Sequence, residues 1–434
     1  MTPGARLAAA IEVYEAIERE RRPAADALKA WGLTHRFAGS GDRAAIAGLL
    51  YDALRRRASS AYLMGADTPR AVLLGMLRRE RSLGTDAIAA LADGTGYSPA
   101  PLTAGERARL DRADLAGAPA YIDGDYPQWL EPHFVRAFGE KRAEEGAALA
   151  SRAPLDLRVN TLAGTRDKAA GMLADLKPQD TRWSPWGLRI PLAAGAKAPP
   201  IHAEPAFLKG LVEVQDEGSQ LATLLANAKP GEQVLDLCAG AGGKTLAMAA
   251  MMENKGQIYA TDDDKRRLAP IHERLKRSGA RNVQVRTPKS VGGELDDLKG
   301  RIDLALIDAP CTGTGAWRRN PDAKWRMRPG ALEQRQKEQA GVLERAVPLL
   351  KAGGRIAYVT CSVLEEENGD QVRTFLARQP DFALVVPGKV AGALGERALL
   401  FTKAARVSEE GLLMTPRTTD TDGFYVSVIE RRGS

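Results

Sequence analysis

Short β-rich segments alternate with helical patterns in the second half of the chain, and this alternation restricts the fold more than any other feature. The β-rich segments are Val234–Cys238, Gln257–Asp262, Val283–Arg286, Ile302–Asp308 and Arg355–Thr360. Helical patterns at Lys265–Ser278 and Ala331–Leu350 lie between several of them. Strands that are connected through helices pair in parallel, and helices then cover both faces of the sheet. We therefore expect an α/β, Rossmann-like domain, with a closing antiparallel strand at Phe424–Glu430.

The first third of the chain has a helical period instead. Apolar residues recur at helical spacing over residues 7–17 and again over 46–54, which predicts an all-α bundle. Arginine clusters at 55–57 and 78–81 end two of the expected helices. Arginines there suit the negative end of the helix dipole, and they equally suit a patch that faces RNA, so both interpretations stay open.

The length of 434 residues favours about three domains. Leu155–Leu162 alternates like a half-buried strand, and Trp183–Pro200 has the composition of a short hairpin and loop. We predict an all-α domain at 1–146, a small α+β connector at 147–210 and the Rossmann-like domain at 211–434.

Composition excludes several classes of protein. The three cysteines form no CxxC pair, which argues against a disulfide framework or a structural zinc site, and we expect no metal. The chain has no apolar run of about 18 residues, and its first helix is acidic, so we expect no membrane span or signal peptide and a cytoplasmic location. The net charge of +7 is compatible with a nucleic-acid partner but does not establish one.

A strand runs into a glycine turn and a helix over Val234–Thr245, where backbone N–H groups can face a ligand. A nucleotide-binding P-loop requires a glycine where this chain has Cys238, and a dinucleotide turn requires one where it has Thr245. The pattern Asp-x-x-x-Gly-x-Gly from Asp236, with Asp262 after the next strand, suits S-adenosylmethionine. Lys244 is explained equally well as a partner of the cofactor's carboxylate or as a surface lysine.

Two cysteines follow strand ends. Asp308 and Cys311 come after the fourth strand and Cys361 after the fifth, so all three are expected at the edge that holds the glycine turn. Ser362 and Glu365 have capping-box spacing, which predicts a helix N-terminus that favours the Cys361 thiolate. The adjacent glutamates oppose that effect, and the sequence does not decide between the two.

Two thiols and a carboxylate beside a methyl donor suit a poorly nucleophilic aromatic carbon such as cytosine C5. Thiolate addition at C6 activates C5, an acid near N3 and N4 stabilises the adduct, and a base removes the C5 proton after methylation. Arginines and lysines interleave with tryptophans over 317–335, as binding of an unstacked RNA base requires. A solvated loop above packed tryptophans is the alternative explanation.

With these residues in view, nearly the whole chain resembles the RsmB/Fmu (Sun) family of RNA 5-methylcytosine methyltransferases. The segments that carry the resemblance are Arg158–Thr161, Gln215–Gln220, Asp236–Thr245, Asp308–Gly315 with Arg318–Asp322, Thr360–Val363 with Glu366–Asn368, and Asp422–Tyr425. The resemblance implies that Cys361 is the nucleophile, that Cys311 assists release of the methylated base and that Asp308 contacts cofactor and cytosine. The all-α front resembles the NusB-like, RNA-binding domain of the branch that methylates 16S ribosomal RNA.

The resemblance also implies binding residues. Those expected to contact S-adenosylmethionine are Cys238, Ala239, Gly240, Ala241, Gly242, Gly243, Lys244, Asp262, Arg267 and Asp308. Those expected to contact RNA are Arg158, Asn160, Arg318, Arg319 and Trp325. One departure concerns the adenine side, where the family commonly has an acid and this chain reads Arg286-Thr287-Pro288-Lys289.

We therefore expect a monomeric, S-adenosylmethionine-dependent RNA cytosine-C5 methyltransferase whose partner is ribosomal RNA. A binding adaptor that keeps the fold without turnover is the main alternative, although a pure binder has no use for two thiols and Asp308. A P-loop-like ATPase is a more distant one.

Overall fold

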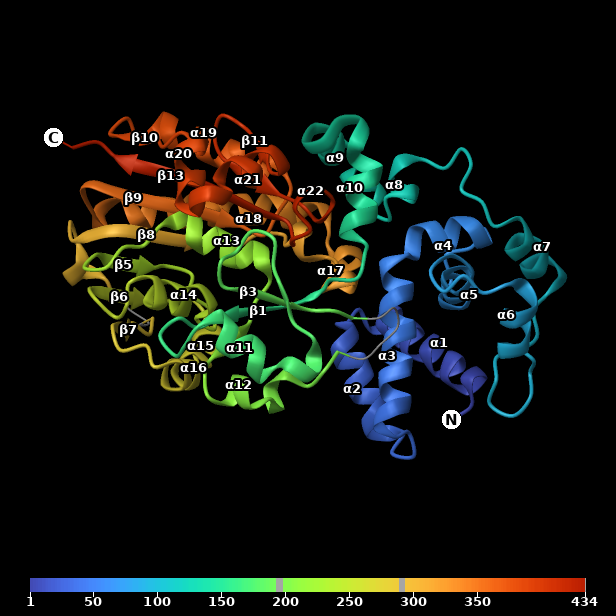
Figure 1. Ribbon diagram of the computed structural model, residues 1–434. Coiled ribbons are helices and arrows are strands. Elements are labelled where there is room, and N and C mark those ends of the chain that lie inside the picture. The colour runs from blue at the N-terminus through green and yellow to red at the C-terminus, as the bar shows by residue number, and fades with distance from the viewer. Residues whose placement is uncertain (193–197, 289–292, 434) are drawn as a thin grey trace. The chain divides into compact units, whose positions relative to one another are not determined.

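The computed structural model describes residues 1–192, 198–288 and 293–433, and the described chain divides into two compact units (Figure 1). The helical unit comprises Met1–Arg152 and Trp317–Arg328. The sheet unit comprises Ala153–Ala316 and Pro329–Ser434. Among the described residues, no helix has the length and apolar character that crossing a bilayer requires.

Helices make up the regular structure of the helical unit, as its periodicity predicts. They are α1 (Pro3–Glu20), α2 (Ala24–Thr34), α3 (Ser40–Arg55), α4 (Arg57–Met64), α5 (Pro69–Arg79), α6 (Thr85–Leu91), α7 (Ala104–Arg112), α8 (Ala120–Asp123), α9 (Glu131–Phe138), α10 (Arg142–Leu149) and α17 (Pro321–Arg326). The core contains Leu7 and Tyr14 of α1 and Ile46 and Leu50 of α3, so the two predicted stripes share one core. The all-α prediction is confirmed, whereas likeness to NusB stays a prediction.

The segment Trp317–Arg328 packs into this bundle although sheet-unit residues flank it in the chain. Trp317 is 1% exposed, and its ring stacks at 5.9 Å from that of Phe134. Lys324 is buried and donates to the carbonyls of Arg55 and Asp125 at 3.1 and 2.5 Å. The segment is therefore part of the bundle core and not a solvated loop.

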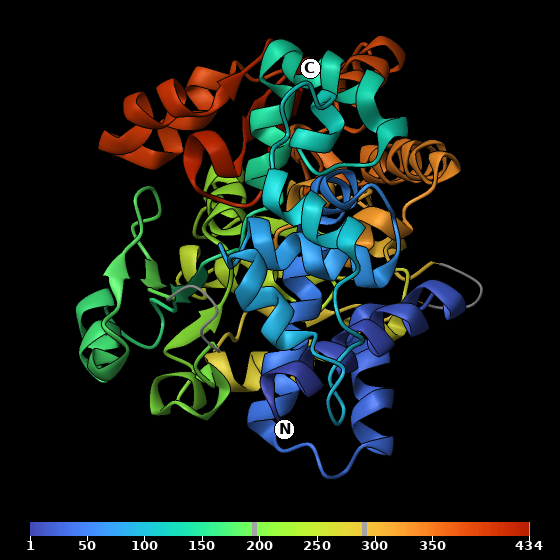
Figure 2. The same ribbon diagram turned by 90° about the vertical axis from the view of Figure 1, so that its right-hand side faces the viewer.

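The connector is a small antiparallel sheet with two helices, in agreement with the predicted α+β content. Its strands lie in the order β2-β3-β1-β4. Their bounds, with those of the helices, are β1 (Leu155–Val159), β2 (Gln179–Asp180), β3 (Gly187–Ile190), β4 (Val212–Val214), α11 (Arg166–Met172) and α12 (Pro205–Leu208). In Figure 2 this sheet is drawn in green at the left of the view. Its last strand, β4, follows the predicted boundary at 210, and the predicted loop includes residues 193–197, which lie outside the described residues.

Nine strands of the described chain form the larger sheet, in the order β11-β12-β13-β9-β8-β5-β6-β7, with β10 paired to β13. They are β5 (Gln233–Asp236), β6 (Gln257–Ala260), β7 (Val283–Val285), β8 (Ile302–Asp308), β9 (Leu350–Thr360), β10 (Phe382–Leu384), β11 (Arg406–Val407), β12 (Leu412–Met414) and β13 (Phe424–Arg431). Strands β5 to β9 pair in parallel, and β13 pairs antiparallel with β9. The predicted Rossmann-like arrangement and its closing strand are confirmed.

The helices of the sheet unit flank these strands (Figure 1). They are α13 (Glu217–Ala226), α14 (Gly243–Met251), α15 (Lys265–Leu268), α16 (Ile271–Ser278), α18 (Pro329–Ala346), α19 (Gly369–Arg378), α20 (Pro387–Ala391), α21 (Ala398–Ala404) and α22 (Pro416–Thr419). The predicted single helix at Lys265–Ser278 is in fact two, separated around Pro270. Proline lacks an N–H group and its ring crowds the preceding turn, so the helix breaks there.

We predict that Trp317→Ala destabilises the helical unit by about 3 kcal/mol, because it leaves a cavity in the core and removes the partner of Phe134. Differential scanning calorimetry measures the change. The matched control is Tyr97→Ala in the same unit, where the ring is 87% exposed and its loss changes little. Equal melting temperatures for the two variants would contradict the packed position of Trp317.

Candidate active site

Parallel pairing brings several polar side chains to one edge of the larger sheet. Asp236 ends β5, Asp308 ends β8, and both strands run in the same direction as β9, which ends just before Cys361. Asp262 follows β6 at the same edge. The carboxyl ends of parallel strands are where ligands bind in sheets of this kind. The structure therefore places the four predicted residues at a single edge.

The glycine turn joins β5 to α14 and has the conformation its glycines allow. Gly240 and Gly242 have φ values of +49° and +83°, in the left-handed region. A Cβ atom on Gly242 would approach Cγ1 of Ile271 to 2.5 Å, so glycine is required there by both backbone and space. The backbone N–H of Gly240 donates to Asp262 at 2.9 Å. Asp262 thus holds the turn in place.

A cavity of about 260 Å³ lies at this turn. Its walls are Val214, Gln215, Ser219, Asp236, Cys238, Ala239, Gly240, Ala241, Gly243, Lys244, Arg267, Arg274 and Asp308. These include most residues predicted to contact the cofactor, and Gly242 and Asp262 support the turn from outside the lining. A buried oxygen of Asp236, Oδ1, has no hydrogen-bond partner among the described residues, which is the kind of group a bound ligand satisfies.

Arg274 is a wall residue that sequence reasoning missed. Its guanidinium donates to the carbonyl of Ala241 at 2.8 Å and to Glu213 at 3.0 Å. Glu213 belongs to β4 of the connector, so Arg274 ties the glycine turn to the small sheet. No motif marks this arginine, because its role depends on a contact between segments that are far apart in the chain.

Lys244 faces the site and is not a surface residue. Its side chain is 9% exposed and its Nζ donates to Oδ2 of Asp308 at 2.7 Å. Burial opposes the charge, but the Asp308 carboxylate, with a smaller contribution from Cys361, raises the pKa of Lys244 above its ordinary value. Lys244 is therefore a cation that orients Asp308, which keeps 34% of its side chain exposed.

The two cysteines lie within contact distance of each other. Their Sγ atoms are 3.4 Å apart. The hydrogen bond with Cys361, together with burial, raises the pKa of Cys311 well above its ordinary value. Cys311 is thus held as a neutral thiol that can donate to the sulfur of Cys361. Of the two thiols, Cys311 is therefore the one whose ionisation the site opposes.

Glu367 holds together the two loops that carry the thiols, and sequence reasoning missed it. It accepts hydrogen bonds from the backbone N–H of Thr312 at 2.8 Å and from Gln339 at 3.0 Å. Gln339 also donates to the carbonyl of Pro310, next to Cys311. Burial raises the pKa of Glu367, and these donors oppose that shift. The sequence placed Glu367 in the segment Glu366–Asn368 that carries the resemblance but gave no sign that its side chain points inward.

The capping box predicted after Cys361 is wrong. Ser362 accepts from the N–H of Leu364 at 3.1 Å, and a 3₁₀ turn at Glu365–Glu367 follows it. Helix α19 begins only at Gly369. The helix dipole is therefore not adjacent to Cys361, and the nearby positive charge is that of Lys244.

The residues predicted to contact RNA are largely turned into the protein. Arg158 and Asn160 are 1% and 2% exposed. Arg158 donates to Gln215 at 2.6 Å, and Asn160 donates to two backbone carbonyls. Arg318 is 2% exposed and lies in the helical unit. Direct RNA contact by these three side chains is not supported, because burial leaves no surface for a phosphate or base.

Arg319 and Trp325 are partly exposed, and their contact with RNA stays a prediction. On the expected adenine side, Arg286 donates to Asp297 at 2.7 Å, whereas Lys289 lies outside the described residues. No cluster of three or more His, Cys, Asp or Glu side chains suited to a metal ion occurs in the described part of the chain.

Residues 222–430 match a family model described as 16S rRNA methyltransferase RsmB/F. This match covers just under half of the chain. Ribosomal RNA small subunit methyltransferase B from Salmonella paratyphi B and that from Salmonella heidelberg are each 37% identical over 269 residues. The alignments cover 61% of this chain and 60% of each relative.

Solved structures extend the comparison of the fold. PH0851 covers 99% of both chains at a TM-score of 0.70 and 24% identity. A methyltransferase homologue from Pyrococcus horikoshii is 27% identical, with a TM-score of 0.57, over 72% of this chain and 97% of that one. NSun6 from Pyrococcus horikoshii with SFG has a TM-score of 0.61 at 22% identity, over 72% of this chain and 100% of that one. The fold of both units thus has a known counterpart.

Asp236 gives the domain a predicted pH dependence. Burial is the main cause that raises the pKa of Asp236 from 3.8 to about 7, while the Thr245 hydroxyl opposes the shift. Because the folded-state pKa is raised, the stability that the protonated form contributes is complete below pH 3.8 and is lost as the pH rises through about 7. Asp236→Asn removes this loss, on the order of 2 kcal/mol between pH 5.5 and pH 8.

Urea unfolding of the native protein and the Asn variant at the two pH values measures this difference. The control Asp175→Asn removes an exposed carboxylate in the same unit and keeps the native pH dependence. Parallel pH profiles for native and Asp236→Asn protein would show that Asp236 does not titrate in this range.

Proposed function

We propose that the protein is an S-adenosylmethionine-dependent RNA cytosine-C5 methyltransferase that acts on 16S ribosomal RNA. The observation that carries the proposal is the pair of sulfurs, 3.4 Å apart, at the strand edge that also holds Asp308 and the glycine turn. The family match of residues 222–430 and the names of the Salmonella relatives support an rRNA methyltransferase. The substrate base and the covalent mechanism are inferences from the site.

The cavity at the glycine turn fits a sulfonium cofactor. It offers backbone N–H groups, the Asp308 carboxylate and the unsatisfied Asp236 oxygen, and the neighbour NSun6 was solved with SFG, an S-adenosylmethionine analogue. Asp262, the expected partner of the ribose hydroxyls, is 2% exposed and holds Gly240 from outside the lining, whereas Arg267 lies in the lining. The bound cofactor supplies the methyl group, which this chain's residues do not carry.

Cys361 performs the first step on cytosine. Its thiolate forms a bond to C6, and the electron pair of the C5–C6 double bond moves so that C5 becomes enamine-like and nucleophilic. Cys311, neutral and hydrogen-bonded, stabilises the negative charge on Cys361 before attack. The nearby Lys244 cation acts in the same direction.

Asp308 orients the base. Lys244 occupies its Oδ2 at 2.7 Å, so Oδ1 is left to accept a hydrogen bond from the exocyclic N4 group of cytosine. The exposed third of the side chain gives the base access to this oxygen. A cytosine held by this hydrogen bond has its C6 atom directed at the sulfur of Cys361.

Cys311 completes the reaction. Once Cys361 is bonded to C6 it is no longer a thiolate, so the largest cause that raises the pKa of Cys311, its hydrogen bond with Cys361, disappears, while burial still opposes ionisation. Cys311 can then release its thiol proton to water and, as a thiolate, take the proton from C5. The electrons of that C–H bond restore the C5–C6 double bond and expel the Cys361 thiolate.

The ATPase alternative loses support from the site. Cys238 stands where the P-loop glycine is required, and Lys244, the residue that would hold phosphates, is paired with Asp308.

Cys361→Ala is expected to lower kcat for methyl transfer by at least about a thousandfold, because no other side chain supplies the bond to C6. Transfer of a tritiated methyl group to unmodified 16S ribosomal RNA measures the rate. Isothermal titration with S-adenosylmethionine is the internal control, and the cofactor Kd should stay within about threefold. Native turnover in this variant would remove Cys361 from the mechanism.

Cys311→Ala is expected to trap the covalent adduct, because the base that removes the C5 proton is lost. An RNA–protein band that survives denaturing electrophoresis reports the adduct. The matched control is the double variant Cys311→Ala/Cys361→Ala, which cannot form the bond and shows no band. If the single variant turns over normally without a band, another group releases the product.

A further inference from the structure

The helical unit contains a hollow rich in arginine, away from the cavity described above. Its volume is about 540 Å³. We call this cavity the arginine hollow. The residues that line it are Tyr14, Ile17, Glu18, Arg21, Leu54, Arg57, Asp322, Trp325, Arg326 and Arg328. All of them belong to the helical unit. The last four come from the segment Trp317–Arg328, here called the inserted segment.

Charge at the arginine hollow is positive and only partly neutralised. Arg57 pairs with Glu18 at 2.7 Å and with Asp67, and Arg326 pairs with Asp322 at 3.1 Å. Arg21 and Arg328 are exposed, and neither has an acidic partner among the described residues. These two guanidinium groups are therefore available to an anion, and phosphate is the anion that arginine binds best by paired hydrogen bonds.

Two aromatic rings flank the same hollow. The Arg57 guanidinium lies 5.9 Å from the centroid of the Tyr14 ring and 5.6 Å from that of Trp325. The Trp325 indole is fixed because its Nε1 donates to the carbonyl of Leu54 at 2.6 Å. Tyr14 is 0% exposed and belongs to the core, so the partly exposed Trp325 is the ring on which an unpaired base can stack, and the base's own phosphate then faces Arg21 and Arg328.

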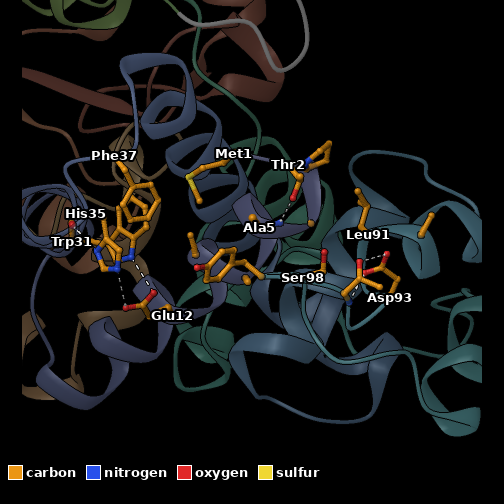
Figure 3. Close-up of a pocket in the computed structure, with 18 residues that line it drawn as sticks. Met1, Thr2, Ala5, Glu12, Trp31, His35, Phe37, Leu91, Asp93 and Ser98 are labelled. Atoms are coloured by element: carbon orange, nitrogen blue, oxygen red, sulfur yellow. Dashed lines mark hydrogen bonds and ion pairs between the residues drawn. The ribbon is translucent and has the colours of Figure 1, made fainter.

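A larger cavity of about 950 Å³ in the same unit has the opposite character. Figure 3 shows its stacked Trp31 and His35 beside Glu12, with Asp93 at the far end. Glu12 and Asp93 are its charged side chains, and no Lys or Arg is among the described residues that line it. A polyanion is repelled there, so of the two cavities only the arginine hollow has the charge that RNA requires.

We propose that the arginine hollow is a second RNA site, which anchors a phosphate and an unpaired base of the substrate outside the target nucleotide. This inference rests on the proposed function for the identity of the RNA. The wall that contains Trp325 continues directly, along the chain, from the loop that carries Cys311. RNA bound at the hollow is thus held by the same stretch of chain that leads to the reacting thiols.

Charge reversal at the two free arginines tests the anchor. For Arg21→Glu/Arg328→Glu we expect the Kd for unmodified 16S ribosomal RNA transcript to rise at least about tenfold at 0.1 M KCl. The slope of log Kd against log salt should fall by about 0.7, the contribution of the one single-strand phosphate contact that is lost. Filter binding without cofactor measures both, so the result does not depend on methyl transfer.

The matched control is Arg36→Glu/Arg112→Glu, which makes the same charge change at exposed arginines of the same unit that do not line the hollow. Its Kd should change less than about threefold, as expected for charge effects at a distance. Arg21→Lys/Arg328→Lys, which keeps the charge, should bind nearly as tightly as the native protein. Circular dichroism melting confirms that all three variants are folded.

Equal weakening in the two Glu variants, or none in either, would overturn the anchor. The proposed function fails separately: if the native protein transfers no methyl group to the transcript while only Arg21→Glu/Arg328→Glu weakens binding, the hollow is an RNA site and the chemistry is misassigned. If methyl transfer proceeds and the hollow variant binds like the control, the function stands and the anchor does not.

Discussion

The site depends on one constraint, the parallel pairing of β5, β8 and β9. Because these strands run in the same direction in register, the residues that follow them meet at one edge, although they are far apart in the chain. The ion pair between Lys244 and Asp308 then joins the turn after β5 to the end of β8 at 2.7 Å. The hydrogen bond from Gly315 to the carbonyl of Cys361 joins the loop after β8 to the loop after β9. Shifting one strand by a residue would turn these side chains to the opposite face and separate the thiols.

The strands and the polar residues at their ends were predictable because both depend on local pattern. A buried parallel strand reads as a short apolar run, and the topology of parallel sheets then fixes which ends meet. Details that depend on competing local bonds were not predictable. Ser362 has the spacing of a capping box, yet it caps its own turn by accepting from Leu364, and the helix starts later at Gly369. Likewise Arg274 and Glu367 stabilise the site through contacts with residues far away in the chain, and no local sequence pattern predicts such contacts.

In the inserted segment, Trp317–Arg328, amino-acid composition alone gives a misleading prediction of what is exposed. Basic and aromatic residues from Trp317 onward suggest an open RNA surface, but burial distinguishes them. Lys324 is fully enclosed, and burial lowers its pKa to about 7 although two backbone carbonyls accept from it. Arg328, four residues later, is exposed. The same composition therefore serves two purposes, packing at Trp317 and Lys324 and a charged surface at Arg328, and only the fold separates the two.

The protons of the two thiols link the geometry of the site to the proposed chemistry. A single cysteine near a carboxylate would lose its proton reluctantly, since like charge and burial both disfavour the thiolate. Here the hydrogen bond with Cys361, whose Sγ lies 3.4 Å away, together with burial raises the pKa of Cys311 well above its ordinary value, and Lys244 is a nearby cation. In the mechanism proposed above, covalent attack by Cys361 would end that hydrogen bond and so remove the largest cause of the raised pKa of Cys311, while burial remains. The order of nucleophile first and base second is thus part of the proposal, and it rests on the close pairing of the two sulfurs.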